Sequence, residues 1–275
     1  MNSPLVSFII PFYNSGETIQ ETIDSIFNQS YKNFDVWIIN DGSTEINAIE
    51  KLKEFEINPQ INILHQENAG PSVARNNAIK KTNADYILPL DSDNIINVKS
   101  IEKSLLIFEK NSQIDAVFGN FEFFGDKTEV KILDDFSIKK SFIYSQMDTC
   151  ALIKKSVFSD GIIYDNYLSK IGLEDWEFWI NFHLSNKKSK YSDFIFFKMR
   201  VSDQSRTFQV ANKNLETIHD YVYKKHAVIL AKEFNNLFYA FKMLKETPDY
   251  KIGNTLLKPW RFFKKLFTNY NIILF

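Results

Sequence analysis

Short apolar runs alternate with segments of helical periodicity in the first third of this chain. The apolar runs have the length and composition of buried strands, and they cover Leu5–Phe12, Asp35–Ile39, Ile61–Leu64 and Tyr86–Leu90. The helical segments between them cover Ser15–Gln29, Ala48–Phe55 and Val73–Lys81, with Ser15 as the expected N-cap of the first. Because strands joined through helices run parallel, this order predicts an α/β fold, a mainly parallel sheet with helices on both faces.

The rest of the chain is less regular. We expect a helix over Val98–Phe108, a helical stripe from Trp176 to Leu184, and helices from about Asn212 onward. The further strands are expected over Ala116–Phe124, Thr149–Ile153 and Ile195–Met199, with a polar loop after the first. These patterns predict one α/β domain over residues 1–210 and a helical C-terminal region over 211–275.

Composition excludes several classes of protein. The net charge of −1 argues against nucleic acid as a partner, and the single cysteine, Cys150, excludes an internal disulfide and a cysteine metal cluster. No apolar run is long enough to span a bilayer, and no basic segment precedes the first apolar run. We therefore expect a cytoplasmic protein.

Two carboxylates follow the fourth predicted strand, in Asp91-Ser92-Asp93. On an extended chain, residues two apart share a face, so we expect both carboxylates to point the same way. Such a pair needs a cation or a polyol ligand between its charges, and Mg²⁺ often takes one or two carboxylates together with phosphate oxygens. The pattern suggests a metal-bound diphosphate, although roughly one Asp-x-Asp is expected by chance in a chain of this length.

Other polar groups follow neighbouring strands. Tyr13 comes after the first and Asp41 after the second. Ligands of open α/β sheets bind beyond the carboxyl ends of the strands, so these groups and the two aspartates predict one binding site. The alternatives are a part-buried tyrosine at position 13 and an Asx turn of Asp41 closed by Gly42.

Sequence blocks in a fixed order resemble the nucleotide-sugar glycosyltransferases of family 2, which have the GT-A fold. The blocks are Val6–Asn14 (VSFIIPFYN), Asn40–Thr44 (NDGST), Asn68–Asn76 (NAGPSVARN), Asp91–Asp93 (DSD) and Glu174–Trp176 (EDW). Together they span about residues 4 to 200. The resemblance implies a GT-A catalytic domain over 1–210, with a nucleotide-sugar half over about 1–95 and an acceptor half over about 96–210.

The resemblance also implies roles for single residues. Tyr13 would stack on the base, Asp41 would accept a hydrogen bond from base or ribose, and Asp91 would contact the ribose. Arg75, at the start of a helix, would meet the diphosphate or the base. The remaining implied contacts to the nucleotide sugar are Pro11 and Ser92. A surface salt bridge is the alternative for Arg75.

Metal binding and catalysis are implied for three acidic residues. Asp93 would hold Mg²⁺ or Mn²⁺, Asp175 would act as general base in an inverting transfer, and Glu174 would position the acceptor. A carboxylate beside aromatic walls gains basicity by desolvation. The alternative is that acidic residues simply favour the first turn of any helix. The implied partners are a nucleoside-diphosphate sugar, with UDP first, and a saccharide or lipid-linked saccharide acceptor.

One departure from the family's pattern leaves a second function open for this chain. Many relatives have a histidine after the last strand that can ligate the metal, whereas this chain has Ser202, followed by Asp203. A non-catalytic nucleotide-sugar-binding or assembly protein with the same fold is therefore the alternative function. A sugar-1-phosphate nucleotidyltransferase fits less well, because the loop Tyr13–Thr18 has one glycine and no cation.

The C-terminal segment 251–275 combines lysine and arginine with aromatic and aliphatic side chains and contains no Asp or Glu. This composition suits a helix in a membrane interface. Peripheral contact with the inner face of the plasma membrane, and a lipid-linked acceptor, would follow. A basic helix packed on the catalytic domain is the equal alternative.

Overall fold

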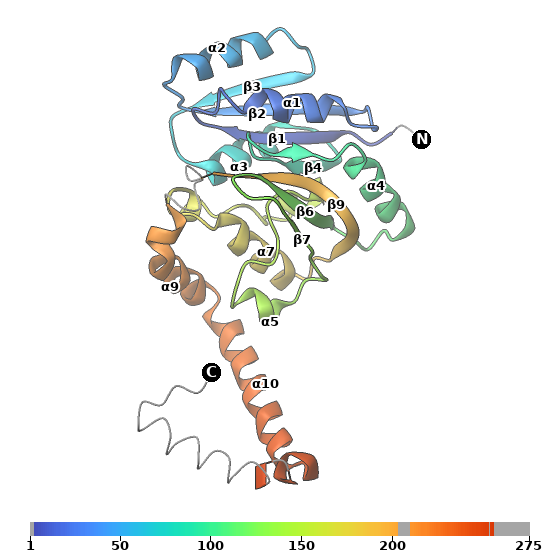
Figure 1. Ribbon diagram of the computed structural model, residues 1–275, viewed down its shortest axis with the longest axis vertical. Coiled ribbons are helices and arrows are strands. Elements are labelled where there is room, and N and C mark those ends of the chain that lie inside the picture. The colour runs from blue at the N-terminus through green and yellow to red at the C-terminus, as the bar shows by residue number, and fades with distance from the viewer. Residues whose placement is uncertain (1–2, 203–209, 253, 256–275) are drawn as a thin grey trace. The chain divides into compact units, whose positions relative to one another are not determined.

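The computed structural model describes residues 3–202, 210–252 and 254–255. Within these residues, nine strands form one sheet (Figure 1). The strands are β1 (Val6–Phe12), β2 (Phe34–Asp41), β3 (Ile61–Gln66), β4 (Tyr86–Pro89), β5 (Ile95–Ile96), β6 (Ala116–Gly125), β7 (Glu129–Lys131), β8 (Leu152–Lys154) and β9 (Ser189–Val201). The α-helices are α1 (Ile19–Phe27), α2 (Ile46–Phe55), α3 (Pro71–Lys81), α4 (Ser100–Lys110), α5 (Ile138–Ser141), α6 (Lys155–Ser159), α7 (Glu174–Leu184), α9 (Leu215–Lys225) and α10 (Ala227–Glu246). Two short 3-10 helices are η1 (Leu168–Lys170) and η2 (Ala211–Asn214).

The strand order is β3-β2-β1-β4-β8-β6-β9-β5, with β7 paired to β6. The first four strands in this order are parallel, as the strand–helix alternation predicts. β8 then runs antiparallel to both β4 and β6, and β6 is parallel to β9. The sheet is therefore mixed and mainly parallel, which confirms the predicted fold class.

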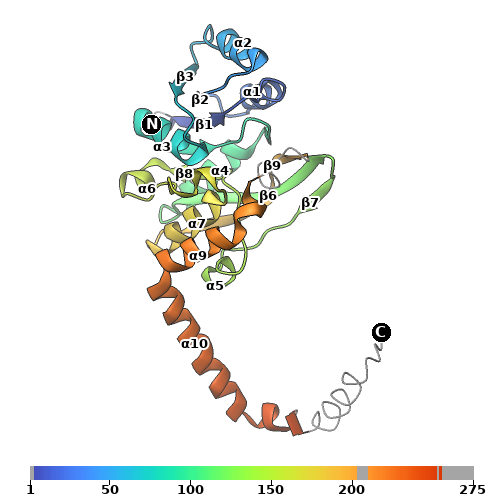
Figure 2. The same cartoon turned by 90° about the vertical axis from the view of Figure 1, so that its left-hand side faces the viewer.

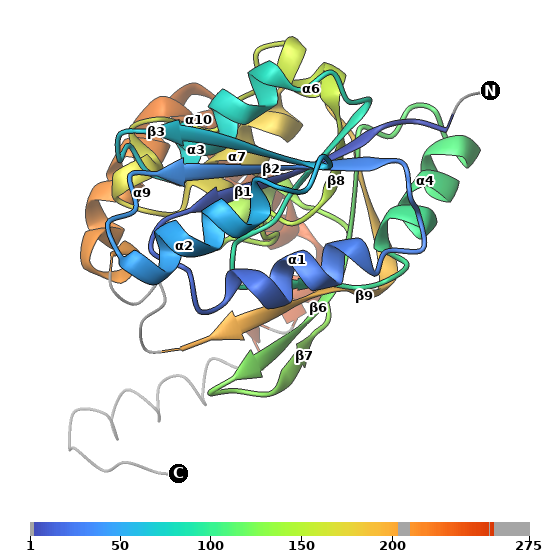
Figure 3. The ribbon, with the colours of Figure 1, turned by 90° about the horizontal axis from the view of Figure 1, so that it is seen from above.

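Helices cover both faces of the sheet (Figure 3). α1 and α2 lie on one face, and α3, α6 and α7 lie on the other. β1 illustrates the physical reason, because its side chains alternate between two apolar cores: Phe8 and Ile10 pack under α1 and α2, whereas Ile9 packs under α3 and α7. A strand buried on both faces needs apolar residues at every position, which explains the continuous apolar run.

Several boundaries differ from the sequence prediction. α1 begins at Ile19, not near Ser15, whose backbone carbonyl instead accepts hydrogen bonds from the N–H groups of Thr18 and Ile19. The predicted polar loop after β6 contains β7 and α5. The last strand is longer than expected, because β9 pairs with β6 over most of the length of β6.

The chain divides into two compact units, residues 1–222 and 223–275. The first unit holds the sheet and most of α9 (Figure 2). Ile218 and Val222 of α9 are buried, and the Tyr221 hydroxyl donates to Asp165. In the second unit, α10 is the longest described helix. No helix among the described residues has the length and apolar character needed to cross a bilayer. Residues 253 and 256–275, and with them nearly all of the predicted membrane segment, lie outside the described residues.

Candidate active site

The predicted site residues gather at the carboxyl edge of the parallel strands. Tyr13 follows β1 directly and is 50% exposed, so a nucleotide could reach its ring. Asp41 is the last residue of β2, and Asp91 follows β4 by two residues. Because β1, β2 and β4 are parallel and in register, their ends coincide along one edge of the sheet. The alignment inferred from the sequence is thus present in the structure.

Asp91, Ser92 and Asp93 form a turn and are not an extended segment. The N–H of Asn94 donates to the Asp91 carbonyl, and the Ser92 carbonyl accepts from the Thr18 hydroxyl at the start of α1. The expectation that the two carboxylates share one face of an extended chain is wrong. The turn gives each carboxylate its own surroundings.

Asp93 lies beside Arg200 near the end of β9. The Arg200 guanidinium donates to the Asp93 backbone carbonyl at 3.3 Å and pairs with Glu21 at 2.6 Å. Burial, followed by the charge of Asp91, raises the pKa of Asp93 to about 6, and Arg200 opposes this rise. A carboxylate destabilised in this way gains most from a bound cation.

Arg75 is buried and joins two acidic segments. One terminal nitrogen donates to Glu174 at 2.9 Å and the other to Asp91 at 2.6 Å, while the guanidinium lies 5.2 Å from the centre of the Tyr164 ring. The two carboxylates raise the pKa of Arg75 although burial opposes this. The alternative prediction of a surface salt bridge is wrong about the surface, because Arg75 is only 3% exposed. Arg75 does form ion pairs, but it forms them as a buried residue. A direct contact between Arg75 and the nucleotide stays a prediction.

Glu174 and Asp175 open α7 after an unusual backbone turn. Gly172 has a φ of 107°, and Leu173, the N-cap, adopts the left-handed conformation with a φ of 56°. Leu173 has a side chain, and such a conformation is costly for it and is typical of functional segments. Burial, and then the charge of Glu174, raises the pKa of Asp175 to about 7. The Asp175 carboxylate is therefore suited to accept a proton near neutral pH.

Asp148 is a further acidic residue of this site that sequence reasoning missed. Its carboxylate accepts from the Cys150 N–H at 2.8 Å, and its backbone carbonyl accepts from Trp179, one turn after Asp175 on α7. Burial and the charges of Asp91 and Asp175 raise its pKa well above the ordinary value. β8 is antiparallel to β4, so continuing their register brings the residues before β8 level with Asp91. The strand direction was the missing signal.

Asp41 organises the loop that follows β3. Its carboxylate accepts three hydrogen bonds of 2.8 Å, from the Gln66 side chain and from the backbone N–H groups of Ala69 and Gly70. The turn after β2 is closed by Asn40, whose side chain accepts from the Ser43 N–H, so the predicted Asx turn belongs to Asn40. Asp41 is 4% exposed.

The residues present fit a metal that is shared with a ligand. Among residues 3–202, 210–252 and 254–255, no group of three or more His, Cys, Asp or Glu side chains is placed to hold a cation. Mg²⁺ commonly binds through one or two carboxylates plus substrate phosphates, and Asp93, with its raised pKa, suits this mode. Ser202 is part-buried, and Asp203 lies outside the described residues.

Comparison with solved structures identifies the class of fold to which this sheet belongs. Staphylococcus aureus TarS 1–349 in complex with UDP-GlcNAc superimposes with a TM-score of 0.63, at 16% identity, over 76% of this chain and 61% of that one. The mannosyltransferase PcManGT from Pyrobaculum calidifontis, in complex with GDP-Man and Mn²⁺, gives 0.58 at 14% identity, over 92% and 84%. The fold is that of the GT-A glycosyltransferases.

The chain belongs to glycosyl transferase family 2, whose model it matches over residues 7–163. It is 28% identical to the Escherichia coli UDP-Glc:alpha-D-GlcNAc-diphosphoundecaprenol beta-1,3-glucosyltransferase WfgD, over 92% of this chain and 99% of the relative. It is 29% identical to the uncharacterized glycosyltransferase MJ1057 of Methanocaldococcus jannaschii, over 88% and 86%. An uncharacterized glycosyltransferase of Rickettsia bellii is 31% identical over 76% of this chain, which spans only 30% of that protein.

Proposed function

We propose that this chain is an inverting glycosyltransferase that moves a sugar from a nucleoside-diphosphate sugar, first of all a UDP-sugar, to a hydroxyl group of a glycan or a lipid-linked glycan. The observation that carries the proposal is the group of Asp91, Glu174 and Asp175 around Arg75, at the edge of the sheet where the exposed Tyr13 also lies. The membership in family 2 and the names of TarS, PcManGT and WfgD support the substrate class.

In the proposed reaction, Asp175 takes the proton of the acceptor hydroxyl as its oxygen attacks the anomeric carbon. The new carbon–oxygen bond forms while the bond to the diphosphate breaks, and the diphosphate leaves with that electron pair. A base acts best when its pKa is near the working pH, and a pKa of about 7 meets this condition. Glu174, fixed by Arg75, would position the acceptor.

Mg²⁺ or Mn²⁺ held by Asp93 would neutralise the charge that develops on the departing diphosphate. Arg75 has a second task in this proposal, in addition to its predicted contact with the nucleotide. Because both of its terminal nitrogens bind carboxylates, it ties the donor segment at Asp91 to the acceptor segment at Glu174. Asp91 would contact the ribose, with Pro11, Tyr13 and Asp41 on the base side.

The test is turnover of UDP-, GDP- and dTDP-sugars with Mn²⁺, together with calorimetric binding of UDP. We expect Asp175→Asn to lose about 10²–10⁴-fold in turnover while it keeps UDP binding. Asp93→Asn is expected to lose the metal dependence of UDP binding. Asp160→Asn is the matched control, because Asp160 is exposed and follows β8 at the opposite edge of the sheet.

Near-native turnover in Asp175→Asn would refute the assignment of the base. The non-catalytic alternative, which Ser202 leaves open, predicts UDP binding with no turnover of any sugar nucleotide by the unmodified chain. The name of WfgD includes a diphosphoundecaprenol-linked sugar. A glycan linked to a polyprenyl diphosphate is therefore the acceptor that the turnover assay should test first.

A further inference from the structure

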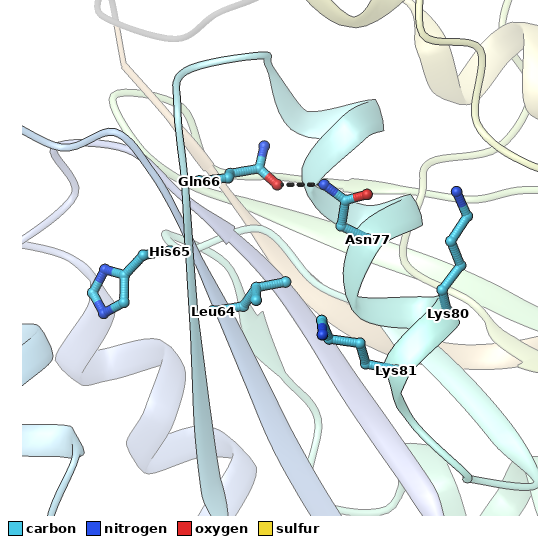
Figure 4. A pocket seen from close by; sticks show the side chains of 6 residues that line it. All are labelled: Leu64, His65, Gln66, Asn77, Lys80 and Lys81. Carbon is cyan, nitrogen blue, oxygen red and sulfur yellow. Dashed lines mark hydrogen bonds between the residues drawn. The ribbon is translucent and has the colours of Figure 1, made fainter.

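Gln66, the last residue of β3, connects Asp41 to Asn77 on α3. Its side-chain N–H donates to Asp41 at 2.8 Å, and its side-chain oxygen accepts from Asn77 at 2.8 Å (Figure 4). A carboxylate only accepts, so the amide nitrogen of Gln66 must face Asp41. The Gln66 oxygen must then face Asn77, which presents its own amide nitrogen. The carboxylate of Asp41 therefore fixes the orientation of the side-chain amides of both Gln66 and Asn77.

The connection follows from the register of the sheet. Asp41 and Gln66 are directly paired residues of β2 and β3, so their side chains lie side by side on one face. α3 covers that face through Ala74 and Ala78, and Asn77 is on the same helix. Each of the three residues is thus held by a regular element.

The hydrogen bonds leave the Asp41 carboxylate little capacity to accept more of them. A carboxylate offers about four acceptor positions, two on each oxygen. Oδ1 accepts from Gln66 and from the Ala69 N–H, and Oδ2 accepts from the Gly70 N–H. One position on Oδ2 remains. A ligand that presents an N–H can occupy it, whereas a ligand that presents a lone pair is repelled.

We propose that Gln66, held by Asn77, is a positioning residue that fixes the Asp41 carboxylate so that Oδ2 accepts the imino N–H of a uracil-type base. This inference rests on the proposed function, since it assumes that the nucleotide lies beside Asp41. Uracil carries a hydrogen on N3, and cytosine has a lone pair there. Gln66 therefore contributes to the preference for uracil over cytosine and makes no contact with the nucleotide itself.

The experiment measures the binding of UDP and CDP, with Mn²⁺, to the full chain by calorimetry. We expect the unmodified chain to prefer UDP at least tenfold. Gln66→Leu should weaken UDP binding about five- to tenfold and leave CDP binding unchanged, because Asp41 loses one of the three hydrogen bonds that position it. A pocket of about 320 Å³, lined by Leu64 and Asn77 among others, flanks Gln66 and gives the leucine room.

Asn77→Ala is the second variant, because it removes only the outer hydrogen bond. It should shift the UDP-to-CDP ratio in the same direction by about two- to threefold. Asn62→Leu is the matched control: it removes an amide from the same strand, away from Asp41, and should leave the ratio unchanged.

Three outcomes would overturn the inference. If Gln66→Leu weakens UDP and CDP equally, Gln66 has only a structural role. If the Gln66→Leu variant keeps the full preference for UDP, the Asp41 carboxylate is positioned without Gln66. An unmodified chain that binds neither UDP nor CDP overturns the inference before any variant is compared. The proposed function itself fails only if the chain also turns over no UDP-, GDP- or dTDP-sugar.

Discussion

Replacing Arg75 by methionine tests the ionic connection between the two halves of the site. The guanidinium is 3% exposed and pairs with Glu174, which is also buried, and with the more exposed Asp91. Methionine keeps most of the volume but removes the charge. Glu174 then loses its ion pair with Arg75, close to Asp175.

Breaking a buried pair by removing one partner costs about 3–5 kcal/mol. We expect Arg75→Met to lower the free energy of unfolding by this amount at pH 8. The loss should be smaller at pH 5, because Asp175, whose pKa is about 7 and is lowered by Arg75, is protonated there and charged at pH 8. Glu174→Gln added to Arg75→Met should restore part of the loss, since it removes a carboxylate that Arg75 paired and that lies close to Asp175.

Urea unfolding followed by tryptophan fluorescence, at both pH values, measures these differences. Lys187→Met is the control, because it removes an exposed ion pair with Asp160, and such pairs contribute about 0–1 kcal/mol. A loss below about 1 kcal/mol for Arg75→Met at pH 8, or a loss that does not depend on pH, would contradict the reasoning.

Two further predictions concern the backbone and the base. Gly70 has a φ of 86° and a Cβ there would overlap the backbone oxygen of Ser169, whereas Gly161 has a φ of 88° with open space around it. Gly70→Ala should therefore cost about 2–4 kcal/mol in urea unfolding and Gly161→Ala about 1–2 kcal/mol, and equal losses would show that the overlap is relieved. For the base, kcat/KM should rise with pH through the pKa of Asp175, about 7, because only the ionised carboxylate accepts a proton. Glu174→Gln removes the like charge that, after burial, raises this pKa and should move the rise to lower pH in the pH–rate profile; an unchanged profile would mean that Glu174 does not act on Asp175.

The order of strands and helices was readable from the sequence because it depends on local periodicity. The apolar run of β1 and the helical spacing of α1 are properties of neighbouring residues. The placement of Tyr13, Asp41 and Asp91 at one edge followed, because parallel strands joined by helices must end on the same side. The boundaries were less accurate: α1 starts at Ile19 because the chain after β1 first makes a turn at Ser15.

The partners of the site residues were decided by the tertiary structure alone. Arg75 and Glu174 are 99 positions apart, and nothing in either segment states that they meet. Asp148 joins the site because β8 runs antiparallel to β4, and Gln66 reaches Asp41 because β3 pairs with β2 in one register. Strand direction and register depend on packing across the whole sheet, and a local pattern of residues does not encode them. The sequence determined which residues line the edge of the sheet, and the fold determined which charges and hydrogen bonds each of them has there.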